Sequence, residues 1–353
     1  MKILHFGDCH LDSAWDRLPP ETAAGFRADS RRVFAEAIEL AKRENVDLIF
    51  CAGDVFDTHE PYHDTVEFCR GVLADAGRPV FIAPGNHDPK GSGSVWSSVR
   101  WSDNVHIFSS GSPERVELED CAVTGVAYTS KNPGSRPFEG YKCPDSGKPE
   151  LLLVHGHTSP NPSEYMSIPH SDIVSAGFAF AGVGHIHSPR ESREGDTLIL
   201  RCGSTEGRGF DEQGEHGCWI VTLEKGRTDA RFVPLEGARA LELTLRADGR
   251  EAADIAAEAA AASPYPPEKT LIRVILEGES GASAGDITAA LSSFAHAEVD
   301  DRTEPPRDLW KRINEDSLVG MFLREVKAMG DSPEALEVLR FGLAALEGKE
   351  QPR

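Results

Sequence analysis

Segments of strand length alternate with segments of helical periodicity through the first part of the chain. Residues 2–6, 46–52 and 79–83 are short and apolar, which is typical of buried strands. Between them, apolar residues recur at helical spacing over 26–41 and 64–76. Strands and helices that alternate in this order indicate a parallel sheet, so the sequence predicts a protein of the α/β class.

The chain becomes richer in short apolar segments after residue 88. Strands are predicted at 105–108, 122–127, 151–154, 178–183, 198–202 and 218–223. The stretch 130–149 is dense in Gly, Pro, Ser and Lys and predicts a long surface loop. A chain of 353 residues is also too long for one typical domain, so we expect at least two.

A smaller α+β unit is predicted to follow the first domain. Its elements are a strand at 241–245, an Ala-rich helix at 251–261, a strand at 270–276 and a helix at 286–294, with a Pro-rich loop over 262–269. Two apolar stripes at helical spacing come last, made of Leu318, Val319, Phe322, Leu323 and Val326, and of Leu336, Leu339, Leu343 and Leu346. Ser332 and Pro333 would begin the second of these helices. We therefore divide the chain into 1–238, 239–304 and 305–353.

Side chains that can bind metal ions stand directly after the predicted strands. They are Asp8 and His10, Asp54, Asn86 with His87 and Asp88 beside it, His155, and His185 with His187. Open α/β sheets place their ligand sites at the carboxyl ends of the strands. Carboxylate, imidazole and amide ligands suit manganese, iron or zinc, and two such ions can activate a water for phosphoester hydrolysis. The sequence therefore predicts two divalent metal ions, with manganese, iron and zinc all compatible with these ligands.

These residues form five motifs in a fixed order, D-x-H, G-D-x-x-D, G-N-H-D, a lone His after a strand, and G-H-x-H. In this the sequence resembles the calcineurin-like metallophosphoesterase superfamily. The resemblance implies a four-layer α/β/β/α sandwich with a small α+β capping domain and C-terminal helices. It implies one metal held by Asp8, His10, Asp54 and His187, and another held by Asp54, Asn86, His155 and His185. His87 would be the general acid, Asp88 would orient its imidazole, and Asp57 would support the ligands or face DNA.

His157 competes with His155 for the place of the lone histidine. The two are separated by one residue and would point to the same side of an extended chain, but His155 ends the strand directly and is preferred. Seven cysteines are scattered without a C-x-x-C pair, which predicts reduced thiols. Cys9 and Cys51, which flank predicted ligands, are interpreted as small buried residues and not as metal ligands.

The segment after the last metal motif resembles the DNA-repair nuclease branch of the superfamily, which includes the SbcD and YhaO types. Residues 203–217 match the pattern G-S-x-x-x-R-x-F-x-E-x-x-x-x-G, in which Arg208 supplies the arginine. That resemblance implies a 3′ to 5′ exonuclease and single-strand endonuclease acting on DNA, a homodimer, and C-terminal helices that dock on an SMC-like coiled-coil ATPase of the SbcC type. The chain has no G-x-x-x-x-G-K-[ST] string, so the ATPase would be a separate polypeptide.

The net charge of −21 argues against nucleic-acid binding, because phosphate binding normally needs a basic surface. Two alternatives therefore stay open: a nucleotide phosphodiesterase or phosphatase of the same superfamily, and a non-catalytic metal-binding adaptor for the ATPase. No apolar run approaches the length of a transmembrane helix and the N-terminus reads as a strand, so we expect a cytoplasmic protein without a membrane partner.

Overall fold

The structure is a computed structural model that describes residues 1–131, 134–159, 161, 164–224, 226–279, 284–304, 307–330 and 332–346. It divides into two compact units. Unit 1 comprises Met1–Arg208 with Gly214–Arg239, and unit 2 comprises Gly209–Gln213 with Ala240–Arg353. None of the helices in the described part of the chain is long and apolar enough to cross a membrane.

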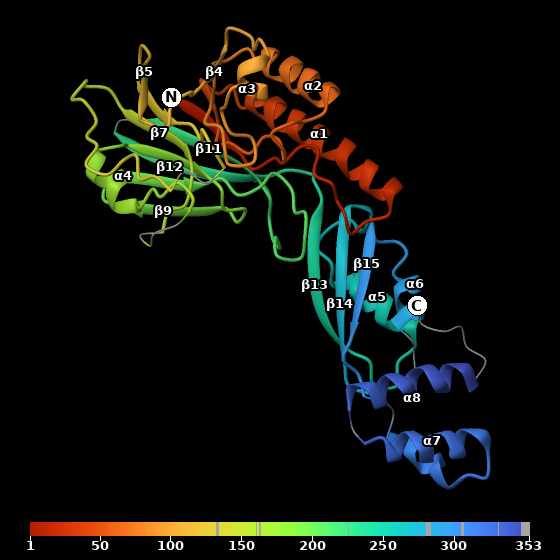
Figure 1. Ribbon diagram of the computed structural model, residues 1–353. Helices are drawn as coiled ribbons and strands as arrows, with labels where there is room; N and C mark the ends of the chain where they lie inside the picture. The colour runs from red at the N-terminus through yellow and green to blue at the C-terminus, as the bar shows by residue number, and fades with distance from the viewer. Residues whose placement is uncertain are drawn as a thin grey trace. The chain divides into compact units, whose positions relative to one another are not determined.

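Unit 1 contains, within its described residues, two six-stranded mixed sheets (Figure 1). The first has the strand order β12-β11-β1-β2-β3-β4. Its strands are β1 (Lys2–Phe6), β2 (Leu48–Cys51), β3 (Val80–Ile82), β4 (Val105–Ile107), β11 (Gly217–Glu224) and β12 (Arg227–Pro234). β1, β2 and β3 are parallel, as the sequence predicts, β4 continues the parallel order, and Cys51 pairs with both Phe6 and Ile82. The loops that follow these strands therefore leave the sheet at the same edge.

The second sheet has the order β5-β6-β7-β8-β10-β9. Its strands are β5 (Glu114–Glu117), β6 (Ala122–Val126), β7 (Glu150–His155), β8 (Phe180–Gly184), β9 (Arg190–Glu194) and β10 (Thr197–Arg201). The four inner strands are parallel, whereas β5 and β9 pair antiparallel at the two edges. The α/β class with mixed sheets is confirmed.

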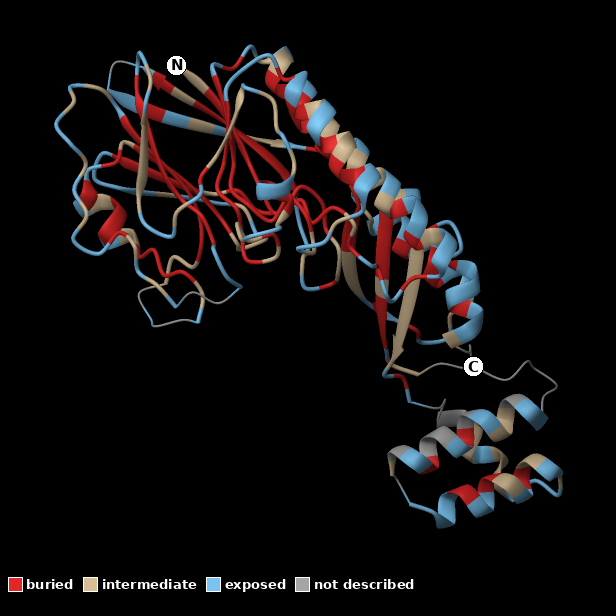
Figure 2. Cartoon of the chain, turned by 45° about the horizontal axis from the view of Figure 1, so that its top comes forward, coloured by how far each residue is buried: buried red, intermediate tan, exposed pale blue. Residues whose placement is uncertain are grey.

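Helices cover the outer faces of both sheets (Figure 1). α1 (Pro20–Arg43), α2 (His63–Ala74) and the short α3 (Val95–Ser98) pack on the first sheet, and α4 (His170–Ala176) packs on the second. A separate apolar cluster lies between the sheets and includes Phe50, Phe81 and Phe180. The layers thus follow the order α/β/β/α. Figure 2 shows the strands mostly buried, while α1 alternates between buried and exposed residues.

Unit 2 contains a three-stranded sheet of order β13-β14-β15, made of β13 (Arg239–Arg246), β14 (Thr270–Glu277) and β15 (His296–Asp301). α5 (Ala252–Ala262) and α6 (Ala284–Ala290) share an apolar core with this sheet, and a 3-10 turn covers Pro267–Lys269. The two predicted strands and the first predicted helix are confirmed, whereas the second helix ends at Ala290 and β15 was not predicted. The role of residues 239–304 as a cap stays a prediction.

The C-terminal part of unit 2 contains a 3-10 segment (Arg307–Asn314) followed by α7 (Leu318–Ala328) and α8 (Pro333–Leu346). Leu323, Val326 and Leu339 form the buried contact between the two helices. Ser332 caps α8 by accepting a hydrogen bond from the amide of Ala335, as its position predicts. The side chain of Leu336 and residues 305–306, 331 and 347–353 lie outside the described residues.

Candidate metal centre

At the carboxyl edge of the two sheets, several residues have a left-handed backbone conformation that residues other than glycine rarely adopt. Asp8, His10, Asp54 and His185 have positive φ angles of 49°, 45°, 46° and 92°. The loops after β1 and β2 are joined there, because the amide of Asp8 donates to the carbonyl of Gly53 (3.0 Å) and that of His10 to Asp54 (2.9 Å). Non-glycine residues in such conformations are strained, and such strain concentrates at functional sites.

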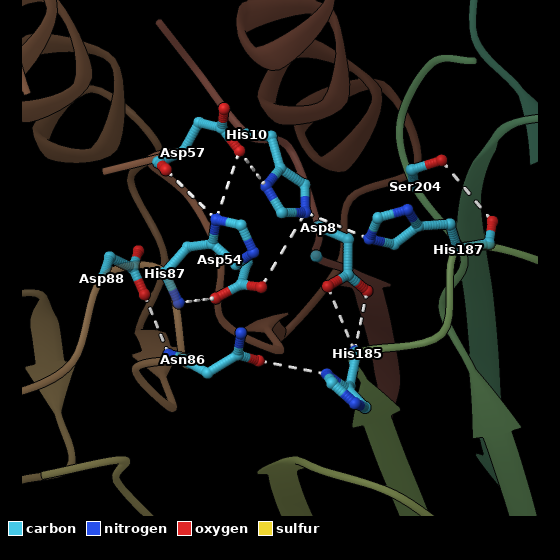
Figure 3. Close-up of polar contacts among 12 residues, drawn as sticks. Asp8, His10, Asp54, Asp57, Asn86, His87, Asp88, His185, His187 and Ser204 are labelled. Atoms are coloured by element: carbon cyan, nitrogen blue, oxygen red, sulfur yellow. Dashed lines mark hydrogen bonds and ion pairs between the residues drawn. The ribbon is translucent and has the colours of Figure 1, made fainter. Parts of the chain in front are cut away.

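His10, Asp54 and His187 form one half of the side-chain cluster (Figure 3). The Nδ1 of His10 donates to Asp57 Oδ1 at 2.8 Å, so the Nε2 of His10 presents a lone pair. That Nε2 lies 3.1 Å from the Nε2 of His187 and 3.8 Å from Asp54 Oδ2. Asp8, His10 and His187 each place a ligand atom within 4.8 Å of the others. These atoms can hold one metal ion.

The other half of the cluster comprises His155, Asn86 and His185, and it also approaches Asp54. His155 is completely buried, and its Nδ1 donates to the carbonyl of Ala52 at 2.8 Å. Its Nε2 therefore also presents a lone pair, 3.4 Å from Asp54 Oδ2 and 2.9 Å from Asn86 Oδ1. The Nδ1 of His185 lies 3.1 Å from the same Asn86 oxygen. These groups can hold a second ion.

The Oδ2 of Asp54 consequently faces the imidazole lone pairs of both His10 and His155, so that hydrogen-bond acceptors face one another without a proton between them. The carboxylate of Asp54 is 2% exposed, and Asp8 beside it is 1% exposed. Buried carboxylates need compensating positive charge, and cations on either side of Asp54 would provide it. Burial lowers the pKa of His10 and lowers that of His185 to about 3, which leaves both imidazoles neutral, as metal binding requires. The residues present therefore fit a dimetal centre.

His87 lies beside this cluster and is partly open to solvent. Its side chain is 38% exposed, and its ring centroid is 4.8 Å from that of His10. Its backbone amide donates to Asp54 Oδ1 at 2.9 Å. Its Nδ1 lies 3.1 Å from the carbonyl oxygen and 3.3 Å from the carboxylate of Asp57. Asp57 raises the pKa of His87 to about 9, chiefly through the hydrogen bond between the His87 ring and the Asp57 carboxylate.

The prediction that Asp88 orients His87 is wrong. The Asp88 carboxylate is buried and accepts hydrogen bonds from the backbone amides of Gly85 and Val55, both at 2.8 Å. Among the described residues, none of its hydrogen bonds goes to His87. Neighbouring side chains in the turn after β3 point in different directions, so Asp88 ties the loops after β2 and β3 together. Asp57 takes the orienting position instead.

Arg208 joins the cluster from the segment after β10. Its Nη1 donates to Ser13 Oγ at 3.0 Å and to Asp57 Oδ1 at 3.3 Å, and its Nη2 is 3.5 Å from His187 Nδ1. Asp57 thus contacts His10, His87 and Arg208 together, in agreement with a supporting position. Sequence reasoning missed Cys202, whose thiol lies 3.3 Å from Asp8 Oδ2, and nothing in its surroundings in the sequence distinguishes it from the other cysteines.

The structure separates the two histidines that the sequence left in competition. His155 is surrounded by Asp54, Asn86 and His185, as described above. The Nδ1 of His157 accepts a hydrogen bond from the amide of Ser159 at 3.3 Å, and its ring centroid lies 6.2 Å from that of His185. This geometry favours His155 as the ligand.

Comparison with known families agrees with the geometry of the cluster. Residues 1–189 match the family described as calcineurin-like phosphoesterase, which is more than half of the chain. The chain belongs to this family. The family and the His/Asp cluster together make the protein a metallophosphoesterase, a hydrolase, with a candidate dimetal centre.

Two curated proteins are similar to this calcineurin-like phosphoesterase. The uncharacterised metallophosphoesterase YhaO of Bacillus subtilis is 26% identical over 245 residues, covering 66% of this chain and 60% of YhaO. The DNA double-strand break repair protein Mre11 of Thermoplasma acidophilum is 26% identical over 254 residues, covering 67% of this chain and 66% of Mre11. The match thus spans less than two thirds of either relative.

Among solved structures, a dimetal phosphatase from Danio rerio is similar to this chain, with 11% identity and a TM-score of 0.43. The match covers 66% of this chain and 95% of the phosphatase. At this level of similarity the comparison adds nothing to the argument from the residues.

Proposed function

We propose that the protein is a metal-dependent DNA nuclease, a 3′ to 5′ exonuclease and single-strand endonuclease of a double-strand-break repair complex. The observation that carries the hydrolytic part is His87, a partly exposed imidazole beside a buried set of metal ligands. DNA as the substrate is supported by the similarity to Mre11 over 67% of the chain.

The predicted division of the ligands follows the two halves of the cluster. One ion would be held by Asp8, His10, Asp54 and His187. The other would be held by Asp54, Asn86, His155 and His185. Two bound ions, manganese as the nuclease resemblance implies, would supply a water nucleophile of lowered pKa and would neutralise charge on the phosphate. Asp54 would be shared by both sites, because its Oδ2 lies 3.8 Å from the Nε2 of His10 and 3.4 Å from the Nε2 of His155.

The protein's own groups would act around that phosphate. His87 would protonate the leaving oxygen, since its side chain is 38% exposed and Asp57 keeps it protonated. Asp57 also fixes the ring of His10 through Nδ1, which orients the Nε2 lone pair toward the metal position. Arg208 holds Asp57 in turn.

A partner surface is proposed on the C-terminal helices. Leu318 and Met321 of α7 are 71% and 56% exposed, and they line a groove of about 460 Å³ with Phe322, Arg324, Glu325, Gly342 and Leu346. Exposed apolar side chains along a helix pair suit an apolar helix as partner, such as the coiled coil of an SMC-like ATPase. The homodimer implied by the resemblance stays a prediction.

The second candidate function is a nucleotide phosphodiesterase or phosphatase with the same centre. The observation that favours it is the net charge of −21, which weakens attraction to a long polyanion but matters less for a small substrate. The adaptor alternative is disfavoured by His87, because Asp57 raises the pKa of His87 to about 9 and a purely structural metal site has no need of a protonated imidazole.

The test is incubation of end-labelled single-stranded and double-stranded DNA with the manganese-loaded protein and with His87→Ala. His59→Ala is the matched control, since His59 is a surface histidine with a side chain 72% exposed. The proposal predicts degradation of DNA by the wild type and by His59→Ala, with a loss of about 100-fold or more in His87→Ala. Turnover of only a small chromogenic phosphodiester would favour the phosphodiesterase. Equal DNA cleavage by all three proteins would contradict the role of His87.

A further inference from the structure

A cavity of about 250 Å³ lies next to the metal centre, on the face of the second sheet that α4 covers. Its polar lining includes Arg190, Arg201, His157, His170, Ser159 and Ser192. Ile186, which stands between the two histidines of the G-H-x-H motif, lines it as well. Within the described part of the chain, no carboxylate is among the lining residues. We refer to this cavity as the Arg190–Arg201 pocket.

The two arginines form a like-charged pair that the fold itself does not neutralise. Arg201 of β10 pairs directly across the sheet with Arg190 of β9. Neither forms an ion pair with any carboxylate among the described residues. The Nε of Arg201 is buried without a hydrogen-bond partner. Burial, and then the charge of Arg190, lowers the pKa of Arg201.

Such an arrangement costs stability. Like charges directly opposite on neighbouring strands repel, and a buried donor without a partner loses its hydration without compensation. Arg193, the next arginine after Arg190 on β9, differs from Arg201 in having a partner. Its guanidinium donates to the carbonyl of Thr228 at 2.6 Å. An anion bound between Arg190 and Arg201 would relieve both costs.

We propose that the Arg190–Arg201 pocket binds a phosphate group of the substrate adjacent to the phosphate that is hydrolysed. The guanidinium groups would bind it through charge-assisted hydrogen bonds. His157 adds a donor: its Nδ1 accepts from the amide of Ser159, so its Nε2 carries the proton. His170 is held by Glu194 at 2.7 Å and would contribute less.

The position of the pocket fits a substrate with more than one phosphate. His157 lines the pocket, and its ring centroid is 6.2 Å from that of the predicted ligand His185. In a protein of net charge −21, a local pair of uncompensated arginines also explains how a polyanion could be held without a basic surface. This inference rests on the proposed function for the identity of the substrate, but the pocket's affinity for phosphate does not depend on it.

The first experiment is calorimetric titration of the metal-free protein with inorganic pyrophosphate. Without metal ions, the arginines are the groups expected to bind it. Arg201→Gln should weaken binding at least about tenfold, whereas the matched control Arg193→Gln should bind as the wild type does. Arg201→Gln should also unfold at the same temperature as the wild type or higher, because the repulsion is removed. Equal affinity in wild type and Arg201→Gln, or no binding by the wild type, would overturn the proposal.

The second experiment identifies the source of the phosphate. With manganese, the KM of the Arg190→Gln/Arg201→Gln variant should rise about tenfold for an oligodeoxythymidylate, while hydrolysis of bis(p-nitrophenyl) phosphate, which has a single phosphate, stays unchanged. If the wild type binds pyrophosphate through Arg201 but cleaves no DNA, the pocket stands and the nuclease proposal fails. A nucleotide would then be the substrate. An unchanged KM for the oligonucleotide in a protein that cleaves it would refute the pocket's role in DNA binding.

Discussion

Raising the pH should lower the free energy of unfolding through one buried carboxyl group, that of Glu206. Glu206 is 1% exposed; its Oε1 is hydrogen-bonded with the hydroxyl of Ser30 on α1, and its Oε2 accepts a hydrogen bond from the amide of Ala238. It lies two residues before Arg208, so it fixes the segment that carries Arg208 to the metal centre. Burial raises the pKa of Glu206 from 4.5 to about 7.

The sign and the size of the effect follow from that pKa. A carboxyl group with a raised pKa favours the folded protein when it is protonated, so its contribution is complete below about pH 4.5 and is lost as the pH rises through about 7. At about 1.4 kcal/mol for each pKa unit, the loss between about pH 5 and pH 8 is on the order of 2 to 3 kcal/mol.

The assay is urea unfolding of the wild type and of Glu206→Gln at both pH values. Glutamine mimics the protonated group: its amide can donate to Ser30 Oγ, which itself donates to the Phe26 carbonyl at 2.9 Å, while its oxygen accepts from Ala238. The variant should match the wild type at about pH 5 and exceed it by on the order of 2 to 3 kcal/mol at about pH 8. A difference that does not change with pH would refute the reasoning.

Three further outcomes follow from the site and from the C-terminal helices. His155→Ala should lose one of two bound manganese ions by atomic emission, whereas His157→Ala should keep both; the reverse would reassign the ligand. Asp57→Asn should lower kcat/KM for a small phosphodiester by about 10- to 100-fold, because it removes the group that orients two histidines, and an unchanged rate would contradict that role. Leu318→Asp combined with Met321→Asp should change the free energy of unfolding by less than about 0.5 kcal/mol and leave phosphodiester hydrolysis intact, since both side chains are exposed. A large destabilisation would mean that these residues are packed.

The fold could be predicted from the sequence wherever a strand or helix buries a continuous apolar surface. The inner strands of both sheets qualify, since Leu48–Cys51 and Phe180–Gly184 are buried throughout. β9 was missed because its sequence, Arg190–Glu194, is polar throughout and an edge strand can leave most of its side chains in water. α4, a helix of seven residues, was also missed.

For the candidate site, too, one part could be predicted from the sequence and another part could not. Residue types and their positions after strands predicted the residues that gather at the centre, because parallel strands bring their carboxyl ends to one edge. The direction of a single side chain is not contained in such a pattern, and Asp88 was misplaced for this reason. The pairing of Arg190 with Arg201 depends on the register of two antiparallel strands, which only the structure provides.

The central claim is a dinuclear centre in which Asp54 lies between two metal ions. Electron paramagnetic resonance of the protein loaded with two equivalents of manganese tests it directly and needs no substrate. The account predicts an exchange-coupled spectrum of two ions about 3.5–4 Å apart, which Asp54→Ala abolishes. Saturation at one equivalent, or the spectrum of isolated ions at two equivalents, would contradict it.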